Sequence, residues 1–136
     1  MIIKTLSDTD SYAHELATRL TVGSVVSLSG PLGVGKTSLI KALCKELGVE
    51  QEVTSPSFVL MNRYQGRVPI FHFDLYRLEE MEEVYELGLQ ECMEQGVCFI
   101  EWPELVEDLL PAEAIRLKMN FKKENVRQIN EEIDAK

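Results

Sequence analysis

A glycine-rich turn between an apolar run and a helical repeat constrains the fold of this chain more than any other feature. Residues 30–37 read Gly-Pro-Leu-Gly-Val-Gly-Lys-Thr and fit the pattern G-x-x-x-x-G-K-[ST]. Residues 25–28, before the turn, form a short β-rich run that is typical of a buried strand. Residues 36–47, after it, place leucine and isoleucine at the spacing of one helix face. This strand, turn and helix together predict a phosphate-binding loop.

The residue types in the turn suit the phosphates of a nucleotide. Glycines allow a tight turn whose successive N–H groups point into one concavity, and the following helix adds its positive dipole end. We expect the Lys36 ammonium to reach the β- and γ-phosphates of ATP and the Thr37 hydroxyl to ligate Mg²⁺. The predicted nucleotide-binding residues are Pro31, Leu32, Gly33, Val34, Gly35, Lys36, Thr37 and Ser38.

Strands and helices alternate along the rest of the chain. We expect helices over residues 8–20 (capped by Asp8 or Thr9), 79–87 and from Pro103 to Pro111, and strands over 57–64, 68–75, 97–100 and 114–121. The buried side of the last strand is expected to hold Ile115, Leu117, Met119 and Phe121. The polar end predicts a frayed tail beyond about Asn130. The 136 residues thus indicate one α/β domain, a P-loop NTPase-like three-layer sandwich around a mostly parallel sheet.

Two acidic residues are candidates for the second half of such a site. A P-loop protein usually carries an acid at the end of a neighbouring strand, which holds the metal or orients the attacking water. Glu101 directly follows one predicted strand, and Asp74 ends another. Either is also compatible with a solvent-exposed acid. Lys36, Asp74 and Glu101 are therefore candidate catalytic residues, and the candidate metal ligands are Thr37, Asp74 and Glu101.

Charge and cysteine content argue against other kinds of protein. The formal charge is −9, and a field of that sign repels phosphate backbones, so direct nucleic-acid binding is not expected. The three cysteines form no C-x-x-C pair, which argues against a disulfide framework and favours buried thiols in a reducing compartment. Because no long apolar segment occurs, we expect a cytoplasmic protein with no membrane partner.

The segment around His72 has several interpretations. His72 and Asp74 share a strand face and invite a zinc-site interpretation, but only two histidines and no paired cysteines occur in the chain. Tyr76 and Arg77 are compatible with switch supports, interface groups or ordinary surface.

Four motifs in order resemble those of the bacterial TsaE (YjeE) family. They are the turn at 30–37, Val53-Thr54-Ser55-Pro56-Ser57-Phe58, His72-Phe73-Asp74-Leu75-Tyr76-Arg77-Leu78 and Glu101-Trp102-Pro103-Glu104. The resemblance runs from the N-terminal helix to about Phe121. It implies an ATPase required for threonylcarbamoyladenosine at position 37 of tRNAs that read ANN codons. Such a protein works with TsaD, the transferase, and TsaB, does not transfer the threonylcarbamoyl group, and meets tRNA only through that complex.

The resemblance also implies roles outside the turn. Thr54 would sense the γ-phosphate or complete the metal shell, in a loop that orders and relaxes as GTPase switches do, which makes it a further candidate catalytic residue. Asp74 and Glu101 would serve the metal and the hydrolytic water. Trp102 would lie beside the nucleotide, although a lone Trp also suits the edge of a core. Ser57 replaces the second threonine of the family's T-S-P-T and keeps its hydroxyl.

Several functional classes stay open at this point. In one hypothesis the chain is an enzyme that hydrolyses Mg-ATP, and we expect it to be slow when alone because few arginines can stabilise the transition state. In another it is a binding module whose ATP-bound form docks on TsaD–TsaB. A small-molecule kinase shares this architecture but needs an arginine-rich lid, and no such insertion occurs. The chain contains no N-K-x-D motif, which favours ATP over GTP.

Overall fold

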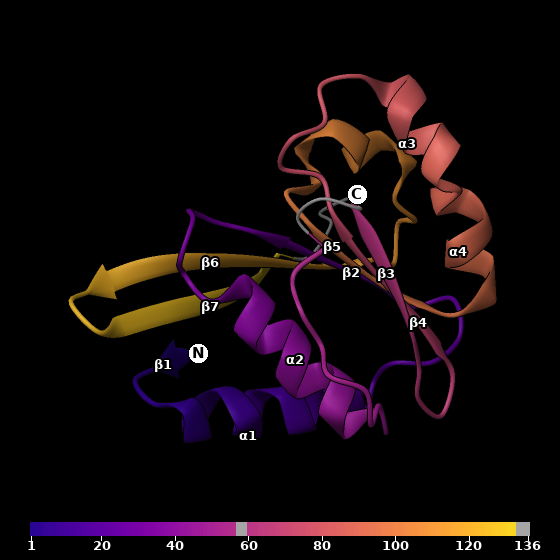
Figure 1. The fold of residues 1–136 in the computed structure, drawn as a ribbon. Coiled ribbons are helices and arrows are strands. Elements are labelled where there is room, and N and C mark those ends of the chain that lie inside the picture. Colours follow the sequence, from indigo (N-terminus) through magenta and orange to yellow (C-terminus); the bar gives the residue numbers. More distant parts are fainter. Residues whose placement is uncertain (57–59, 133–136) are drawn as a thin grey trace.

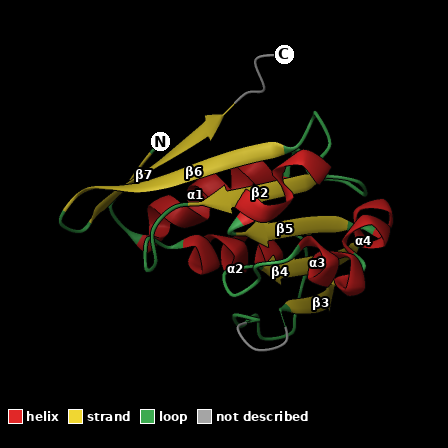
Figure 2. Cartoon of the chain, turned by 90° about the horizontal axis from the view of Figure 1, so that it is seen from above, coloured by secondary structure: helices red, strands yellow, loops and turns green. Residues whose placement is uncertain are grey.

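One open sheet forms the centre of the structure, a computed structural model that describes residues 1–56 and 60–132. Its seven strands are β1 (Ile2–Ile3), β2 (Val25–Ser29), β3 (Met61–Gln65), β4 (Pro69–Asp74), β5 (Val97–Glu101), β6 (Ile115–Lys123) and β7 (Val126–Glu132). They lie in the order β1-β7-β6-β2-β5-β4-β3 (Figure 2). The pairs in the middle, β6–β2, β2–β5 and β5–β4, are parallel, and the outer pairs are antiparallel. The predicted α/β fold is confirmed, and β3 and β4 pair as an antiparallel hairpin.

Helices cover both faces of the sheet. They are α1 (Leu6–Ala17), α2 (Lys36–Glu46), α3 (Met81–Leu87), α4 (Leu89–Gln95) and the 3-10 helix η1 (Pro103–Leu109). In Figure 1, α1 and α2 lie below the sheet, and α3 and α4 lie on the other side. Because side chains alternate along a strand, β5 supplies both cores: Phe99 packs with α1 and α2, whereas Ile100 packs with α3, α4 and η1. The predicted three-layer sandwich is therefore confirmed, and the three cysteines are free and buried as expected.

The C-terminal strand β7 occupies part of the segment predicted to be a polar tail. β7 pairs with β6 and β1 pairs with β7, and the amino group of Met1 donates to the carbonyl oxygen of Ile129 at 3.0 Å. Ladder hydrogen bonds use backbone groups, so polar side chains conceal such a strand from side-chain patterns. Because β7 reaches Glu132, the prediction of fraying is wrong for Glu131 and Glu132. Residues 133–136 lie outside the described part.

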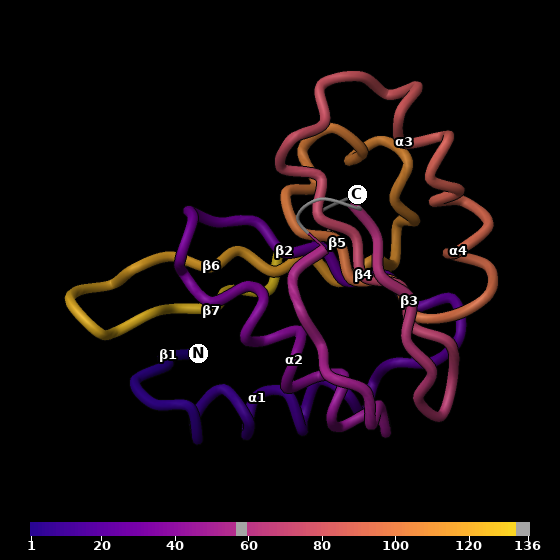
Figure 3. Tube along the Cα trace, in the orientation of Figure 1, coloured from indigo at the N-terminus to yellow at the C-terminus, as the bar shows by residue number. Residues whose placement is uncertain are grey.

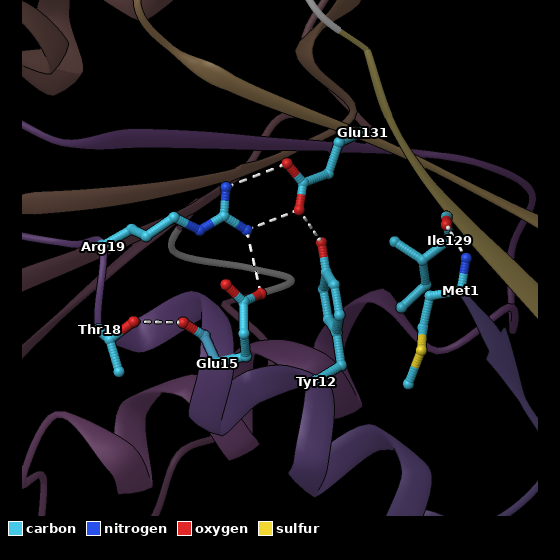
Figure 4. Close-up of polar contacts among 7 residues, drawn as sticks. All are labelled: Met1, Tyr12, Glu15, Thr18, Arg19, Ile129 and Glu131. Carbon is cyan, nitrogen blue, oxygen red and sulfur yellow. Dashed lines mark hydrogen bonds and ion pairs between the residues drawn. The ribbon is translucent and has the colours of Figure 1, made fainter.

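A polar cluster fastens β7 to α1 (Figure 4). The hydroxyl of Tyr12 donates to Oε1 of Glu131 at 2.8 Å. The guanidinium of Arg19 donates to both carboxylate oxygens of Glu131, at 2.6 and 3.1 Å, and to Glu15 at 3.2 Å. The C-terminal hairpin is thus held to the first helix by charged hydrogen bonds as well as by the sheet.

Several boundaries differ from the predictions. Helix α1 begins at Leu6 because Thr5, and not Asp8 or Thr9, is its N-cap, while Asp8 completes the capping box. The segment from Pro103 is a 3-10 helix, and α4 was not predicted; Gly88, with a φ of 75°, separates it from α3. In β6, Leu117 and Met119 are buried as predicted, but Phe121 is 50% exposed because the sheet ends in a hairpin there.

The parallel strands bring the predicted site residues to one edge of the sheet. β2 leads into the glycine-rich turn, and β5 and β4 end at Glu101 and Asp74. Figure 3 follows the chain from β2 through the turn into α2. Glu101 is the ladder partner of both Leu28 and Asp74, so the three strand ends are level with one another.

Candidate functional site

The predicted P-loop, residues 30–37, has a backbone that depends on its glycines. Gly30, Gly33 and Gly35 have φ angles of 143°, 79° and 111°, which L side chains rarely adopt. Gly30 also lies against β6, where a Cβ atom would overlap the carbonyl oxygen of Met119. Gly35 is the N-cap of α2, so the first N–H groups of this helix, which have no intrahelical acceptor, lie at the end of the loop.

The P-loop forms one wall of a cleft of about 420 Å³. The predicted site residues in its wall are Leu32, Gly33, Gly35, Lys36, Thr37, Ser38, Asp74, Glu101 and Trp102. The cleft is completed by Ser55, Tyr76 and Arg77. Pro31, Val34 and Thr54 are described by the structure but do not line this cleft. Most of the predicted site therefore meets at the carboxyl ends of the parallel strands, where α/β sheets bind ligands.

Lys36 is held inside the cleft by the P-loop and by Trp102. Its side chain is buried, and Nζ donates to the carbonyl oxygens of Gly30 and Pro31, the latter at 3.3 Å. Nζ also lies 3.7 Å from the centre of the Trp102 ring, a cation–π contact. Burial lowers the pKa of Lys36, and the negative charge of Glu101 opposes that shift. The ammonium group is therefore largely removed from water.

Glu101 connects the P-loop to the interior of the sheet. Its Oε2 accepts a hydrogen bond from the Thr37 hydroxyl at 3.0 Å and lies 2.6 Å from Nε2 of His72. The side chains of Glu101 and His72 are 4% and 0% exposed. A buried carboxylate needs such donors, because an unpaired buried charge is costly. The sequence analysis considered His72 for a zinc site, found little support for one, and did not predict this contact; its one clue was the strand face that residues 72 and 74 share.

Asp74 lies beside Glu101 on the neighbouring strand. The two are ladder partners, and the alternation of β4 and β5 places both on the face of the sheet that α2 covers. Asp74 is half-buried, and its Oδ1 accepts a hydrogen bond from the N–H of Tyr76 at 3.1 Å. Burial raises the pKa of Asp74, that hydrogen bond lowers it, and the charge of Glu101 raises it further. The cleft thus holds two adjacent carboxyl groups with different exposure.

Trp102 leaves β5 in an unusual backbone conformation. Its φ and ψ are 59° and 61°, a left-handed conformation that is uncommon for a residue other than glycine. Its N–H donates to the carbonyl oxygen of Leu28 at 3.2 Å, and its ring lies 4.8 Å from that of Tyr76. Strained residues of this kind cluster at functional sites, and here the strain turns the indole into the cleft.

The predicted switch loop approaches the cleft through Ser55. The N–H of Thr54 donates to the Tyr64 hydroxyl at 3.2 Å, and its side chain is exposed. Ser55 contributes to the cleft wall and was not predicted to do so. Ser57, the position that departs from the family's motif, lies outside the described residues.

Oxygen donors, and not a histidine–cysteine cluster, are available for a metal ion. Within residues 1–56 and 60–132, no three or more His, Cys, Asp or Glu side chains form a group that could hold a metal. Mg²⁺ does not require one, because it binds one or two protein oxygens together with phosphates and water. The adjacent oxygens of Thr37 and Glu101 match that donor chemistry.

Known proteins with similar sequences place this arrangement in one family. The family model described as "Threonylcarbamoyl adenosine biosynthesis protein TsaE" matches residues 3–129. The chain belongs to the TsaE family. It is 37% identical over 129 residues to the tRNA threonylcarbamoyladenosine biosynthesis protein TsaE of Treponema pallidum. This alignment covers 94% of this chain and 96% of the Treponema protein. The TsaE protein of Bacillus subtilis is 36% identical over 124 residues, 90% of this chain and 77% of its own.

A solved structure agrees with this assignment. The crystal structure of Bacillus subtilis YdiB superposes with a TM-score of 0.79 at 28% identity, covering 99% of this chain and 84% of YdiB. This TsaE chain therefore belongs to a family of tRNA threonylcarbamoyladenosine biosynthesis. Its described helices include none with both the length and the apolar character needed to cross a bilayer.

Proposed function

We propose that this TsaE-family protein binds and hydrolyses Mg-ATP and acts with TsaD and TsaB as a nucleotide-driven switch in tRNA threonylcarbamoyladenosine formation. The observation that carries the proposal is the meeting of Lys36, Thr37 and Glu101 in one cleft at the N-terminus of α2. An ammonium, a hydroxyl and a carboxylate at such a point are the groups that P-loop NTPases use for phosphates and metal. We place the protein in the cytoplasm, and it is not itself the transferase.

A second cavity supports the proposal by offering space for the nucleoside next to the cleft. This cavity, of about 290 Å³, shares Gly35 and Ser38 with the first cleft. Its wall combines apolar side chains such as Val34 and Met119 with Arg127, whose Nε is buried and has no hydrogen-bond partner in the described part of the chain. A partly apolar cavity with a convergent polar group is typical of a small-molecule site. A nucleotide with its phosphates at α2 can therefore continue into this cavity.

The two acidic residues are assigned different tasks. Glu101 shares its oxygen with the Thr37 hydroxyl, so we assign Thr37 and Glu101 to Mg²⁺. Asp74 is half-exposed at the cleft wall, so we assign it to the hydrolytic water. When bound, the metal neutralises charge on the phosphates, while Lys36 offsets the negative charge that develops at the γ-phosphate.

Turnover by the protein alone is expected to be slow. Arg77 supplies the arginine of the cleft wall, and a positioned arginine from a partner accelerates some P-loop enzymes by about 10³- to 10⁵-fold. We infer that TsaD and TsaB order the segment of Thr54 and Ser55, or supply groups of their own. ATP occupancy would then set the conformation that docks, and hydrolysis would reset it.

Single-turnover hydrolysis of Mg-ATP, with and without TsaD and TsaB, tests this function. We expect slow phosphate release by the protein alone, faster release with the partners, and none by Lys36→Ala. Lys41→Ala, which removes an exposed lysine of the same helix, is the control and should behave like the wild type. Fast hydrolysis that the partners leave unchanged would exclude the switch. Normal ATP binding by Lys36→Ala would exclude the P-loop assignment, and phosphate transfer to a small molecule would favour the kinase alternative.

A further inference from the structure

His72 is a buried polar residue that the proposed hydrolysis does not use directly. It lies in the middle of β4, with Asn62 of β3 and Phe99 of β5 as ladder partners. Its imidazole is fully buried, on the face of the sheet that α2 covers. Burying a polar ring is costly unless its nitrogen atoms are paired, and an aliphatic side chain would fill the same space at lower cost. The imidazole therefore requires a specific explanation.

The contact between His72 and Glu101 has a defined hydrogen-bond direction. A carboxylate only accepts hydrogen bonds, so its contact at 2.6 Å requires a hydrogen on Nε2 of His72. Nδ1 is buried and has no hydrogen-bond partner among residues 1–56 and 60–132. The contact is thus a hydrogen bond that Nε2 of His72 donates to the Glu101 carboxylate.

We propose that His72 is a positioning residue for Glu101, a role that rests on the proposed nucleotide site. His72 and Thr37 both donate to Oε2, and these are the hydrogen bonds that the described residues make to the carboxylate. The two donors come from different elements, β4 and α2, and they fix the plane of the carboxylate. Oε1 would then remain available to a metal ion or a water molecule in the cleft.

The end of β5 explains why Glu101 needs this support. Glu101 is the last residue of the strand, and the chain turns away at Trp102 with a positive φ. Thr37 belongs to the P-loop, whose groups must also engage phosphate and metal. The hydrogen bond from His72 instead comes from β4, which is paired on both sides, with β3 and β5. Groups behind a metal ligand hold its orientation in this way in other metal sites.

Two substitutions at this position separate positioning from packing. His72→Leu removes the donor and keeps an apolar filling, whereas His72→Gln can place an N–H group near the same point. For His72→Leu we expect a fall in kcat of about 10- to 100-fold with little change in Mg-ATP affinity, and for His72→Gln a partial recovery. Ile70→Val, equally buried two residues earlier on the same face, is the control and should keep the wild-type kcat. Equal losses in His72→Gln and His72→Leu, or the same loss in Ile70→Val, would overturn the proposal.

Imidazole ¹⁵N NMR of the wild-type protein tests the contact without nucleotide or turnover, and so remains informative if His72→Leu does not fold. We expect hydrogen on Nε2 of His72, and a shift of this signal in Glu101→Gln but not in Ile70→Val. Absence of hydrogen on Nε2, or a signal that does not respond to Glu101→Gln, would overturn the proposal. If the NMR result is as expected but the wild type hydrolyses no ATP, the proposed function is wrong, whereas the hydrogen bond between His72 and Glu101 is confirmed. If the wild type hydrolyses ATP and His72→Leu keeps its kcat, only the positioning role fails.

Discussion

Nζ of Lys36 lies 3.7 Å from the centre of the Trp102 ring, so the lysine predicted to bind phosphate contacts the residue that directly follows Glu101. Trp102 is the single tryptophan of the chain, and its ring also lies next to that of Tyr76. At the end of β5, Glu101 thus contacts Thr37 through its carboxylate, and the next residue, Trp102, contacts Lys36 through its aromatic face.

This contact makes Trp102 a reporter of nucleotide binding. We expect Mg-ATP to change the fluorescence of the protein, because a phosphate that attracts Lys36 alters the cation above the indole. Lys36→Ala should change the emission of the free protein and abolish the response to Mg-ATP. A titration of the wild type, Lys36→Ala and Lys41→Ala measures this. An unaltered response in Lys36→Ala would contradict the expected movement of the ammonium.

Asp74→Asn should stabilise the free protein while it lowers turnover. The pKa of Asp74 is raised, so its charged form is disfavoured in the folded state at neutral pH. Below the unfolded pKa both states are protonated and the penalty disappears. We therefore expect Asp74→Asn to raise the free energy of unfolding at pH 7, and this gain should shrink as the pH falls toward 4. The gain is about 0.5 kcal/mol, because solvent screens the charge of a half-exposed group. Urea unfolding without nucleotide, with exposed Asp108→Asn as control, measures it; a loss of stability at pH 7 would contradict the assignment.

Tyr12→Phe should weaken the attachment of β7 to α1. It removes the hydrogen bond to Glu131 at a mostly buried position, and we expect a loss of about 1 to 2 kcal/mol at pH 7. Hydrogen bonds from Arg19 chiefly, and from Tyr12, lower the pKa of Glu131 in the folded protein. The stability that these bonds contribute is therefore present above the pKa of Glu131 in the unfolded chain, near 4.5, and is lost as the pH falls through the lower pKa of the folded state. Urea unfolding at pH 7 and at lower pH tests both statements. Exposed Tyr85→Phe should have almost no effect, and an equal loss there would argue against a specific clamp.

Gly30→Ala should be more damaging than Gly33→Ala. Both glycines have positive φ, which costs about 1 kcal/mol for alanine, but a Cβ at Gly33 meets no atom within 4 Å. A Cβ at Gly30 overlaps the Met119 backbone of β6, so the P-loop and β6 would have to separate, at a further cost of about 1 to 3 kcal/mol. Thermal unfolding and Mg-ATP titration of the two variants test this. Equal losses of stability would show that φ strain alone accounts for both positions.

Much of the fold follows from local patterns. The glycine spacing of the P-loop requires a particular backbone, and the strand, turn and helix around it are read from neighbouring residues. The capping box of α1 was also present in the sequence, but its cap, Thr5, lies three residues before Asp8, the earlier of the two predicted caps, and the predicted helix start was displaced accordingly. The 3-10 helix after Trp102 has the same apolar spacing as an α-helix over a single turn, so the pattern alone does not separate them.

The elements that could not be predicted depend on partners distant in sequence. β7 carries mainly polar side chains and exists because its backbone pairs with β6 and β1 and because Glu131 meets Tyr12. The role of Ser55 in the cleft wall depends on how the loop lies against the P-loop, a relation between segments about twenty residues apart.

The sequence by itself determined the glycine-rich turn between a strand and a helix, its lysine and hydroxyl, and the acidic residues at two strand ends, because each is a matter of residue type and local spacing. Only the tertiary structure decided that His72 donates to Glu101, that Thr37 reaches the same carboxylate oxygen, and that Lys36 rests on Trp102. These contacts join β4, β5 and α2, and their distances are set by strand register and helix packing, which no local pattern of side chains specifies.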